Sequence, residues 1–292
     1  MTDIEKHKRD EGQGGRNIGR LLVIGGNEDK DEDNMVILPH FVEMCGGSKA
    51  RIVVCGAPSA SPEEKERTYK KLFLKIGAAD VYEANVTERP EGEDEELLLA
   101  VKKATGVFFT GGDQMRLTSL VAGTAFGEEI RHRLWNEGLV VGGTSAGAAA
   151  MSSTMITGGS DRGTVRRADV RLAPGLGYWR DTVIDTHFAQ RGRVSRLLVI
   201  FAQNPQVLGI GIDEDTAVEV QPGKRFSVVG TGACFVFDGT VTHTNAPDVG
   251  DDEVIAMTDS LSHVLPSGYG FDLHTKRPIL PEGEVIDARA SA

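Results

Sequence analysis

The sequence predicts an α/β fold: a doubly wound, mostly parallel sheet flanked by helices, with extra short strands toward the C-terminus. Three observations support this expectation. Continuous apolar runs such as "LLVI" and "IVVC" are typical of strands buried on both faces, as in parallel sheets. These runs alternate with segments of helical character, which favours a β-α-β order. Many of the 36 glycines directly follow the apolar runs, where tight strand-to-helix turns need them.

The expected strands share an apolar run that ends in a glycine or an acidic turn. In chain order they span residues 20–26, 50–60, 80–86, 107–113, 139–145, 181–188 and 206–220. Ligands of such folds bind beyond the carboxyl ends of the strands. We therefore expect the glycine turns at 25–26, 111–112 and 142–143 to gather at one edge of the sheet.

Three helices are expected from apolar periodicity and from residues typical of helix ends. Residues 62–77 have Pro62 in the first turn and Gly77 at the end. Residues 94–106 also end in glycine, and residues 193–205 are helix-like as well. After residue 225 the pattern changes to short strands and turns.

The domain organisation predicted from the chain is simple. Neither a repeat nor a linker interrupts residues 20–292, so we expect one α/β domain there. The first 19 residues are charged and glycine-rich, which predicts a disordered tail. That stretch lacks the apolar core of a secretory signal, and no apolar run approaches the roughly 18 residues of a membrane span.

Charge and cysteine content narrow the partners and the compartment. The net charge of −11 argues against sequence-independent binding to nucleic acid or to an anionic membrane surface. Cys45, Cys55 and Cys234 show no CxxC spacing, so we expect neither a disulfide framework nor a zinc site. These features favour a reducing, cytoplasmic compartment.

The segment Gly143–Gly147 has the pattern G-x-S-x-G between an apolar strand and an alanine-rich stretch. On a sharp strand-to-helix turn, small neighbours let the Ser145 hydroxyl protrude where backbone N–H groups can stabilise an oxyanion. The same residues also fit a packing turn or an anion-binding helix start. The pattern alone leaves Ser145 between these roles.

A serine nucleophile needs a base, and an acid that orients the base. His187 stands out among the seven histidines because it follows the strand "TVID" at its carboxyl edge. Candidate acids are Asp213, Glu214 and Asp215, which end another apolar strand. From residue types alone the choice among the three stays open, and a solvated acidic turn is an alternative for at least two of them.

Two further segments complete the candidate site. The loop "FFTGGDQMR" can supply a second oxyanion donor beside the N–H of Ala146, from Gly112 or Asp113. It can equally be a helix start with Asp113 as N-cap. Three arginines near His187 suit an anionic substrate group, although a solvated helix face is the alternative. These are Arg191, Arg193 and Arg196.

Five segments in this order resemble the cyanophycinases, serine peptidases related to peptidase E with a fold similar to the class I glutamine amidotransferase domain (flavodoxin-like). They are "IGGNEDK", "FFTGGDQ", "GTSAGAAAM", "DTHFAQRGRVSRLL" and "GIGIDEDTA". The resemblance runs from about residue 20 to residue 220.

The resemblance implies hydrolysis of cyanophycin, a poly-aspartate with arginine on each side chain, to β-Asp-Arg dipeptides. It makes Ser145 the nucleophile, His187 the base and Glu214 the third member. It also implies a homodimer and a reaction that needs neither a metal nor an organic cofactor. Substrate-pocket positions are matched by Gln114, Asp185, Thr186, Arg191, Arg193 and Arg196. The family often has glutamine where this chain has Thr186, which affects fine specificity and leaves the triad intact.

Two alternatives remain beside this prediction. One is an aspartyl dipeptidase resembling peptidase E, with the same triad and β-linked or other small aspartyl peptides as substrates. The other is a non-catalytic binding protein on the same fold, in which Ser145 only starts a helix. A thiol-dependent amidotransferase is disfavoured because serine occupies the turn.

Overall fold

The main sheet of the computed structural model has nine strands in the order β17-β16-β11-β10-β1-β5-β4-β2-β3. The structure describes residues 17–31, 33–159, 164–239 and 243–281. Five strands run parallel: β1 (Leu21–Ile24), β5 (Val140–Thr144), β4 (Gly106–Phe109), β2 (Arg51–Cys55) and β3 (Asp80–Glu83). Antiparallel strands extend the other side: β10 (Thr216–Gln221), β11 (Arg225–Gly230), β16 (Gly270–Asp272) and β17 (Arg277–Ile279). The predicted α/β class with a mostly parallel central sheet is confirmed.

A second sheet carries two of the predicted strands. Its order is β15-β12-β9-β8, and β8 pairs with β9 in parallel. The strands are β8 (Thr182–Thr186), β9 (Leu208–Ile212), β12 (Ala233–Asp238) and β15 (Leu261–Pro266). The expected strand at 206–220 therefore divides at Asp213–Asp215 into β9 and β10, which belong to different sheets. Two hairpins complete the strands: β6 (Thr154–Gly159) with β7 (Val170–Pro174), and β13 (His243–Thr244) with β14 (Met257–Thr258).

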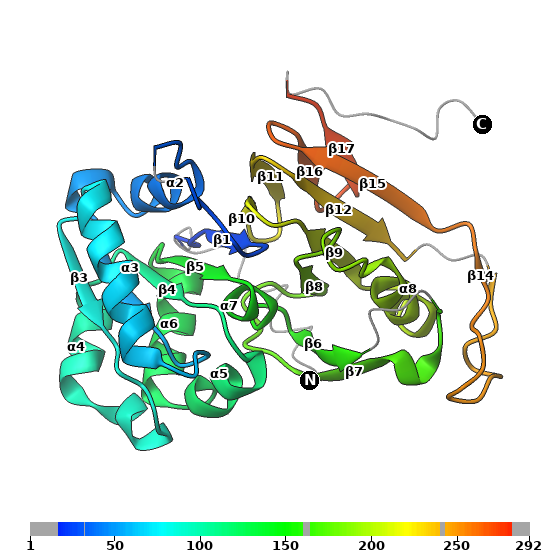
Figure 1. The fold of residues 1–292 in the computed structure, drawn as a ribbon, viewed down its shortest axis with the longest axis horizontal. Helices are drawn as coiled ribbons and strands as arrows, with labels where there is room; N and C mark the ends of the chain where they lie inside the picture. Colours follow the sequence, from blue (N-terminus) through cyan, green and yellow to red (C-terminus); the bar gives the residue numbers. More distant parts are fainter. Residues whose placement is uncertain (1–16, 32, 160–163, 240–242, 282–292) are drawn as a thin grey trace, which may run out of the picture.

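Helices cover both faces of the parallel strands (Figure 1). On one face lie α2 (Ile37–Met44) and α3 (Pro62–Ile76); on the other lie α4 (Glu95–Lys103), α5 (Gln114–Val121), α6 (Ala125–Asn136) and the short α7 (Ala146–Ala149). Successive residues of β1 alternate between the two clusters, with Leu22 on the α2–α3 side and Val23 on the other. This two-sided burial is why the strands are continuously apolar. The helix α8 (Val194–Gln203) packs on the second sheet.

Several boundaries differ from the sequence predictions. The helix expected at 94–106 ends at Lys103, and Gly106 begins β4 instead. Gly142 and Gly143 lie inside β5 and not in a turn. A Cβ at Gly142 would lie 2.5 Å from the Phe41 ring, so this glycine lets a helix approach the strand closely. The helices α2 and α6 were not among those expected, and the start of α5 was expected only as an alternative interpretation of the second glycine loop.

The last three residues of the predicted disordered tail, 17–19, have defined contacts in the structure. Asn17 forms an isolated bridge with Glu137, and the N–H of Gly19 donates to Leu134 O at 2.7 Å. Residues 17–19 therefore pack against α6, and residues 1–16 of the predicted tail lie outside the described residues. The expectation of one domain over 20–292 stays a prediction.

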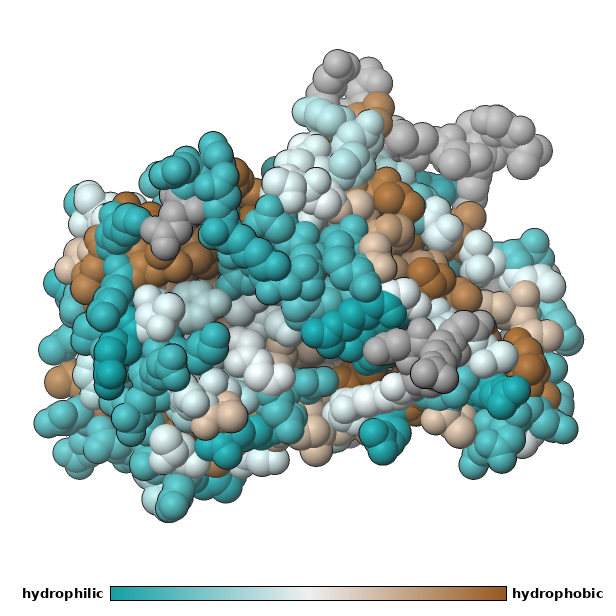
Figure 2. Space-filling model, in the orientation of Figure 1, coloured by the Kyte–Doolittle hydropathy of each residue, from teal (hydrophilic) through white to brown (hydrophobic). Residues whose placement is uncertain are grey.

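The surface in the view of Figure 2 is mostly hydrophilic, with hydrophobic residues gathered at the upper right, over β12 and β15. On the edge strand β15, Val264 is 60% exposed. Within the described part of the chain, no helix combines the length and the apolarity that a bilayer crossing requires. The three cysteines are buried free thiols.

Candidate active site

Ser145 stands at the tight turn between β5 and α7, with φ 51° and ψ −110°. Its N–H donates to Ile24 O at 3.0 Å, which ties the turn to the end of β1. A Cβ at Gly147 would lie 2.4 Å from Phe109 O, so the following helix can meet the sheet only with glycine there. The small residues have the steric role expected of them, and the strained serine is held by its surroundings.

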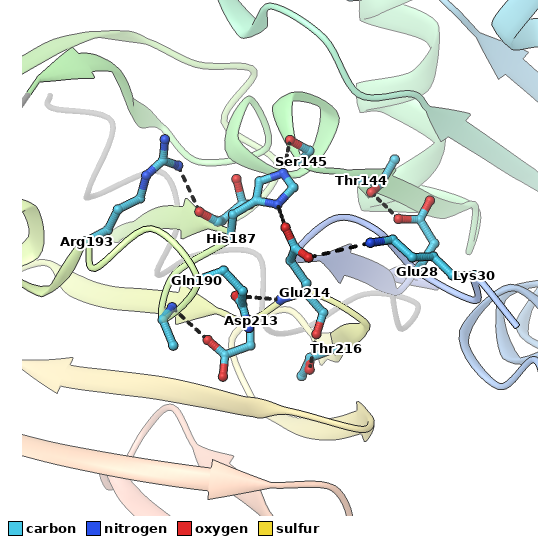
Figure 3. Close-up of polar contacts among 12 residues, drawn as sticks. Glu28, Lys30, Thr144, Ser145, His187, Gln190, Arg193, Asp213, Glu214 and Thr216 are labelled. Atoms are coloured by element: carbon cyan, nitrogen blue, oxygen red, sulfur yellow. Dashed lines mark hydrogen bonds and ion pairs between the residues drawn. The ribbon is translucent and has the colours of Figure 1, made fainter. Parts of the chain in front are cut away.

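His187 meets Ser145 from the carboxyl end of β8. Its Nε2 lies 2.9 Å from Ser145 Oγ, and its Nδ1 lies 2.8 Å from Glu214 Oε1 (Figure 3). The backbone of His187 has φ 50°, and its N–H donates to Gly25 O at 2.9 Å. Because an ionised carboxylate only accepts, Nδ1 carries the proton and Nε2 is left to accept from the serine hydroxyl. This is the geometry of a serine, its base and an orienting acid.

Glu214 is the acid that faces the histidine, and its two neighbours turn away. Asp213 accepts the Ala189 N–H at 2.9 Å, and Asp215 accepts the Asp29 N–H at 2.9 Å. Both flanking aspartates therefore serve the backbone of adjoining loops. Among the three acids, Glu214 is therefore the one whose carboxylate contacts His187, and it is also the one that the family resemblance selects.

The surroundings of Glu214 keep it charged. A hydrogen bond from the Asn27 side chain, followed by the one from His187, lowers the pKa of its carboxyl, and Lys30 Nζ adds attraction at 3.9 Å from Oε2. The Glu214 N–H donates to Gln190 Oε1 at 3.0 Å. Asn27, Lys30 and Gln190 were not expected to contribute, although they lie within the segments "IGGNEDK" and "HFAQRGR".

The imidazole of His187 is held neutral. Burial lowers its pKa, and the positive charges of Arg191 and Arg193 act in the same direction, against the opposing effect of Glu214. A neutral imidazole is the form that can take a proton from Ser145. Gly26 closes over the ring: a Cβ there would lie 2.4 Å from His187 Cε1.

The second glycine loop lies beside the nucleophile, as expected. A Cβ at Gly111 would lie 3.5 Å from Ser145 Cβ. Among the described residues, the N–H groups of Gly112 and Ala146 donate to no acceptor outside regular helix and strand bonding. Both remain candidates for an oxyanion hole, as expected from the sequence.

The expectation that Asp113 contributes its N–H to the oxyanion hole is wrong. That N–H donates to Pro58 O at 2.9 Å. The carboxylate of Asp113 accepts the N–H of Met115 at 2.8 Å and caps α5. The alternative interpretation, a helix start with Asp113 as N-cap, is therefore confirmed.

The predicted pocket residues fall into two groups. Asp185 and Arg196 are 3% and 5% exposed, and Arg196 Nε lies 3.2 Å from Asp185 Oδ2. Arg193 Nη1 lies 3.2 Å from Asp185 Oδ1 and donates to Thr186 O at 2.8 Å. Asp185 and Arg196 therefore have each other as ion-pair partners inside the protein, and their expected role in the substrate pocket stays a prediction.

The other expected pocket residues differ from one another in exposure and contacts. Arg191 is exposed and lies four residues after His187. Gln114 Nε2 donates to Ile156 O on β6 at 2.6 Å. Thr186 is buried at the end of β8. Within the described residues, no three His, Cys, Asp or Glu side chains are grouped to hold a metal ion.

Comparison with known proteins places this chain in a family. The model of peptidase family S51 matches residues 21–228. A relative named cyanophycinase from Geminocystis herdmanii is 38% identical over 260 residues, covering 89% of this chain and 95% of its own. Those from Trichormus variabilis and Synechococcus elongatus, also named cyanophycinase, are 38% and 36% identical, covering 89% and 88% of this chain and 87% and 80% of theirs.

Solved structures agree in fold. A peptidase from an acI-B1 Actinobacterium superposes with a TM-score of 0.61 at 22% identity, covering 85% of this chain and 98% of that one. A putative peptidase E protein from Listeria monocytogenes gives a TM-score of 0.51 at 17% identity, covering 74% and 100%. At these identities the likeness concerns the fold alone.

Proposed function

The chain belongs to peptidase family S51 and is a serine-type peptidase, and we propose that it hydrolyses cyanophycin through Ser145, His187 and Glu214, releasing β-Asp-Arg dipeptides. The observation that most supports the proposal is the continuous hydrogen-bonded chain Ser145 Oγ–His187 Nε2 and His187 Nδ1–Glu214 Oε1, at 2.9 and 2.8 Å. The choice of cyanophycin as the substrate is based on the relatives named cyanophycinase.

In the proposed first step, His187 Nε2 takes the proton of Ser145 while Oγ attacks the scissile backbone carbonyl carbon. Glu214 stabilises the imidazolium that results. The oxyanion lies between the N–H groups of Ala146 and Gly112, which can donate because neither is used elsewhere among the described residues.

In the second half, the tetrahedral intermediate collapses and the C–N bond breaks. The imidazolium returns its proton to the leaving amine, which leaves an acyl group on Ser145. Water then attacks this ester while His187 takes its proton, and the imidazolium returns that proton to Ser145 Oγ as the C–O bond breaks and the carboxylic acid product leaves. No metal or cofactor enters these steps.

Substrate recognition is proposed to depend on the exposed guanidinium of Arg191, which suits the carboxylate of the arginine that each aspartate side chain carries. Arg193 lies between this surface and the buried Asp185, which fixes its position. In this proposal Asp185 and Arg196 form the floor of the pocket and do not contact the substrate directly.

The proposal also includes a homodimer in the cytoplasm, with no nucleic acid or membrane as partner. The net charge of −11 argues against nucleic acid and anionic membranes as partners, and the free, buried thiols suit a reducing compartment. The homodimer rests on the family resemblance alone. Light scattering would give the mass of the particle, and a monomer at micromolar concentration would refute the dimer.

The experiment is clearing of a cyanophycin suspension, with mass spectrometry of the soluble products. We expect β-Asp-Arg from the wild type and no clearing by Ser145→Ala. Ser153→Ala is the matched control, because Ser153 is an exposed serine eight residues further along. Full activity in Ser145→Ala would refute the triad. Cleavage of Asp-X dipeptides without any clearing would instead show an aspartyl dipeptidase.

A further inference from the structure

The loop at residues 25–30 surrounds the base and the acid of the site. Its carbonyl groups accept the N–H of His187 and the N–H of Asp215, both at 2.9 Å. Lys30 Nζ lies 3.9 Å from Glu214 Oε2. The loop therefore contacts each of the two strand ends that present His187 and Glu214.

Within this loop, Glu28 turns away from the acid and toward the strand that carries the nucleophile (Figure 3). Its Oε2 accepts the Thr144 hydroxyl at 2.6 Å, and its Oε1 accepts the Tyr69 hydroxyl at 2.6 Å. Thr144 is the last residue of β5 and directly precedes Ser145. One carboxylate thus joins the loop, the end of β5 and α3.

The α3 end of this contact is firmly held. The Tyr69 ring packs against Phe108 and Phe73, with centroids 4.9 and 5.9 Å apart. Burial and the nearby Glu28 carboxylate raise the pKa of Tyr69 well above its usual value, so the phenol keeps the proton that it donates. Glu28 is therefore fixed from the side opposite to the nucleophile.

The serine turn needs such support. A non-glycine residue at φ 51° and ψ −110° is strained and persists only where its surroundings hold it. The backbone bond from Ser145 to Ile24 is one support. The side-chain bond from Thr144 to Glu28 is a second, and it joins the turn to the loop that orients the base.

We propose that Glu28 is a positioning residue, which fixes the Ser145 turn relative to the His187–Glu214 pair through the Thr144 hydroxyl. The proposal rests on the proposed function in taking these three side chains as the reacting set. Its consequence is that loss of the bond misplaces Oγ relative to Nε2. Reactivity of the serine should then fall while substrate binding stays nearly unchanged.

The test compares Thr144→Val with Tyr69→Phe. Each removes one 2.6 Å hydroxyl bond to the same carboxylate with little change of shape, but only the first touches the nucleophile turn. We expect Thr144→Val to lower kcat roughly tenfold or more with KM within about twofold, and Tyr69→Phe to lower kcat less than about threefold. The double variant Glu28→Gln/Thr144→Val should be no slower than the slower single variant.

A second readout separates this proposal from the substrate assignment. The rate at which a fluorophosphonate labels Ser145 should fall in the same ratio as kcat, whatever the natural substrate is. Glu219→Gln is the matched control: it alters another partly buried carboxylate, bonded by Arg20 and His40, and should keep the wild-type labelling rate.

The outcomes are distinct. Equal kcat and labelling rates in Thr144→Val and wild type would overturn the role of Glu28 while leaving the peptidase intact. Wild type that is labelled but does not clear cyanophycin would overturn the substrate only. Wild type that is neither labelled nor active would overturn both proposals.

Discussion

Ser145 Oγ lies 2.9 Å from His187 Nε2, although 42 positions of sequence separate the two side chains. The contact forms because β5 and β8, from different sheets, end at the same place. Both residues have positive φ, at 51° and 50°, so each strand end turns sharply to present its side chain. Two predictions test this contact, and two more test buried charged groups elsewhere in the fold.

The first prediction concerns pH. His187 must be neutral to take the serine proton, so kcat/KM should rise with pH through the pKa of His187 and then level off. Burial and two arginines lower this pKa from its usual value of 6.5, so the rise should be complete by neutral pH. Replacing Arg191 with Ala removes a positive charge and should move the rise to higher pH.

The pH profile of kcat/KM at low salt measures this shift. Arg225→Ala is the control, since Arg225 is an exposed arginine on β11 that does not act on His187. The shift in Arg191→Ala should shrink at high salt, because salt screens exposed charges. An unchanged midpoint in Arg191→Ala would contradict the electrostatic explanation.

The second prediction concerns Gly26. An alanine Cβ there would lie 2.4 Å from His187 Cε1, and the backbone has φ 106°. Gly26→Ala should displace the imidazole and lower kcat/KM by roughly a hundredfold. Gly46→Ala is a close control: its φ is 108°, but nothing lies within 4 Å of the added Cβ.

Both alanine variants carry a similar backbone penalty, so both should lose about 1 kcal/mol of unfolding free energy. Only Gly26→Ala should lose activity. Urea unfolding and steady-state kinetics on both proteins separate the two effects. Equal activity in the pair would show that the ring tolerates the extra atom.

The third prediction concerns the buried pair of Asp185 and Arg196, 3.2 Å apart. Asp185→Asn removes a negative charge that lies 3.2 Å from the guanidinium groups of both Arg196 and Arg193. The unfolding free energy should fall by roughly 3–5 kcal/mol, because the substitution breaks a buried ion pair and leaves its positive side in place.

Adding Arg196→Met to Asp185→Asn should recover part of this loss, since the buried charge goes with its partner. Urea unfolding of the two single variants and the double variant gives the coupling energy. Additive losses in the double variant would show that the two side chains do not stabilise each other.

The fourth prediction concerns Glu66, a fully buried carboxyl on α3. It accepts the Gly56 N–H at 2.7 Å and the Asn85 N–H at 2.9 Å, and burial raises its pKa from 4.5 to about 7. The folded state therefore binds this proton more tightly than the unfolded state. Its contribution to stability should be full below about pH 4.5 and fall as pH rises through about 7.

Glu66→Gln should lack this slope. Between about pH 5 and pH 7.5, wild type should lose about 2 kcal/mol more unfolding free energy than the variant does. Urea titrations at the two pH values measure the difference. Parallel behaviour of the two proteins would mean that Glu66 titrates normally.

Much of the fold followed from local pattern. The strands at β1, β2 and β5 were predicted because both faces of each are buried, which makes them continuously apolar. The helix α3 was predicted because Pro62 and Gly77 mark its ends. The helices α2 and α6 were missed, and the start of α5 at Asp113 was expected only as an alternative. Gly142 was misplaced in a turn, whereas it lies inside β5 in close contact with Phe41.

The candidate site was also predicted only in part. The residue types around Ser145 and His187 predicted a serine and its base, because each ends a strand whose carboxyl edge is where ligands bind. Residue types alone could not distinguish the three adjacent acids. The direction of each acidic side chain depends on distant groups with which it forms hydrogen bonds, and only the family resemblance selected Glu214. The N–H of Asp113 was misassigned for the same reason, since its acceptor Pro58 is 55 positions away.

The sequence by itself determined the α/β class, the small-residue turn at Ser145 and the histidine that faces it, because these depend on hydrophobic pattern and steric size along the chain. Only the tertiary structure decided that Glu214 meets His187, that Arg196 is buried against Asp185, and that Glu28 bonds Thr144. Hydrogen bonds and ion pairs join groups brought together by the packing of separate strands, and no local pattern specifies such partners.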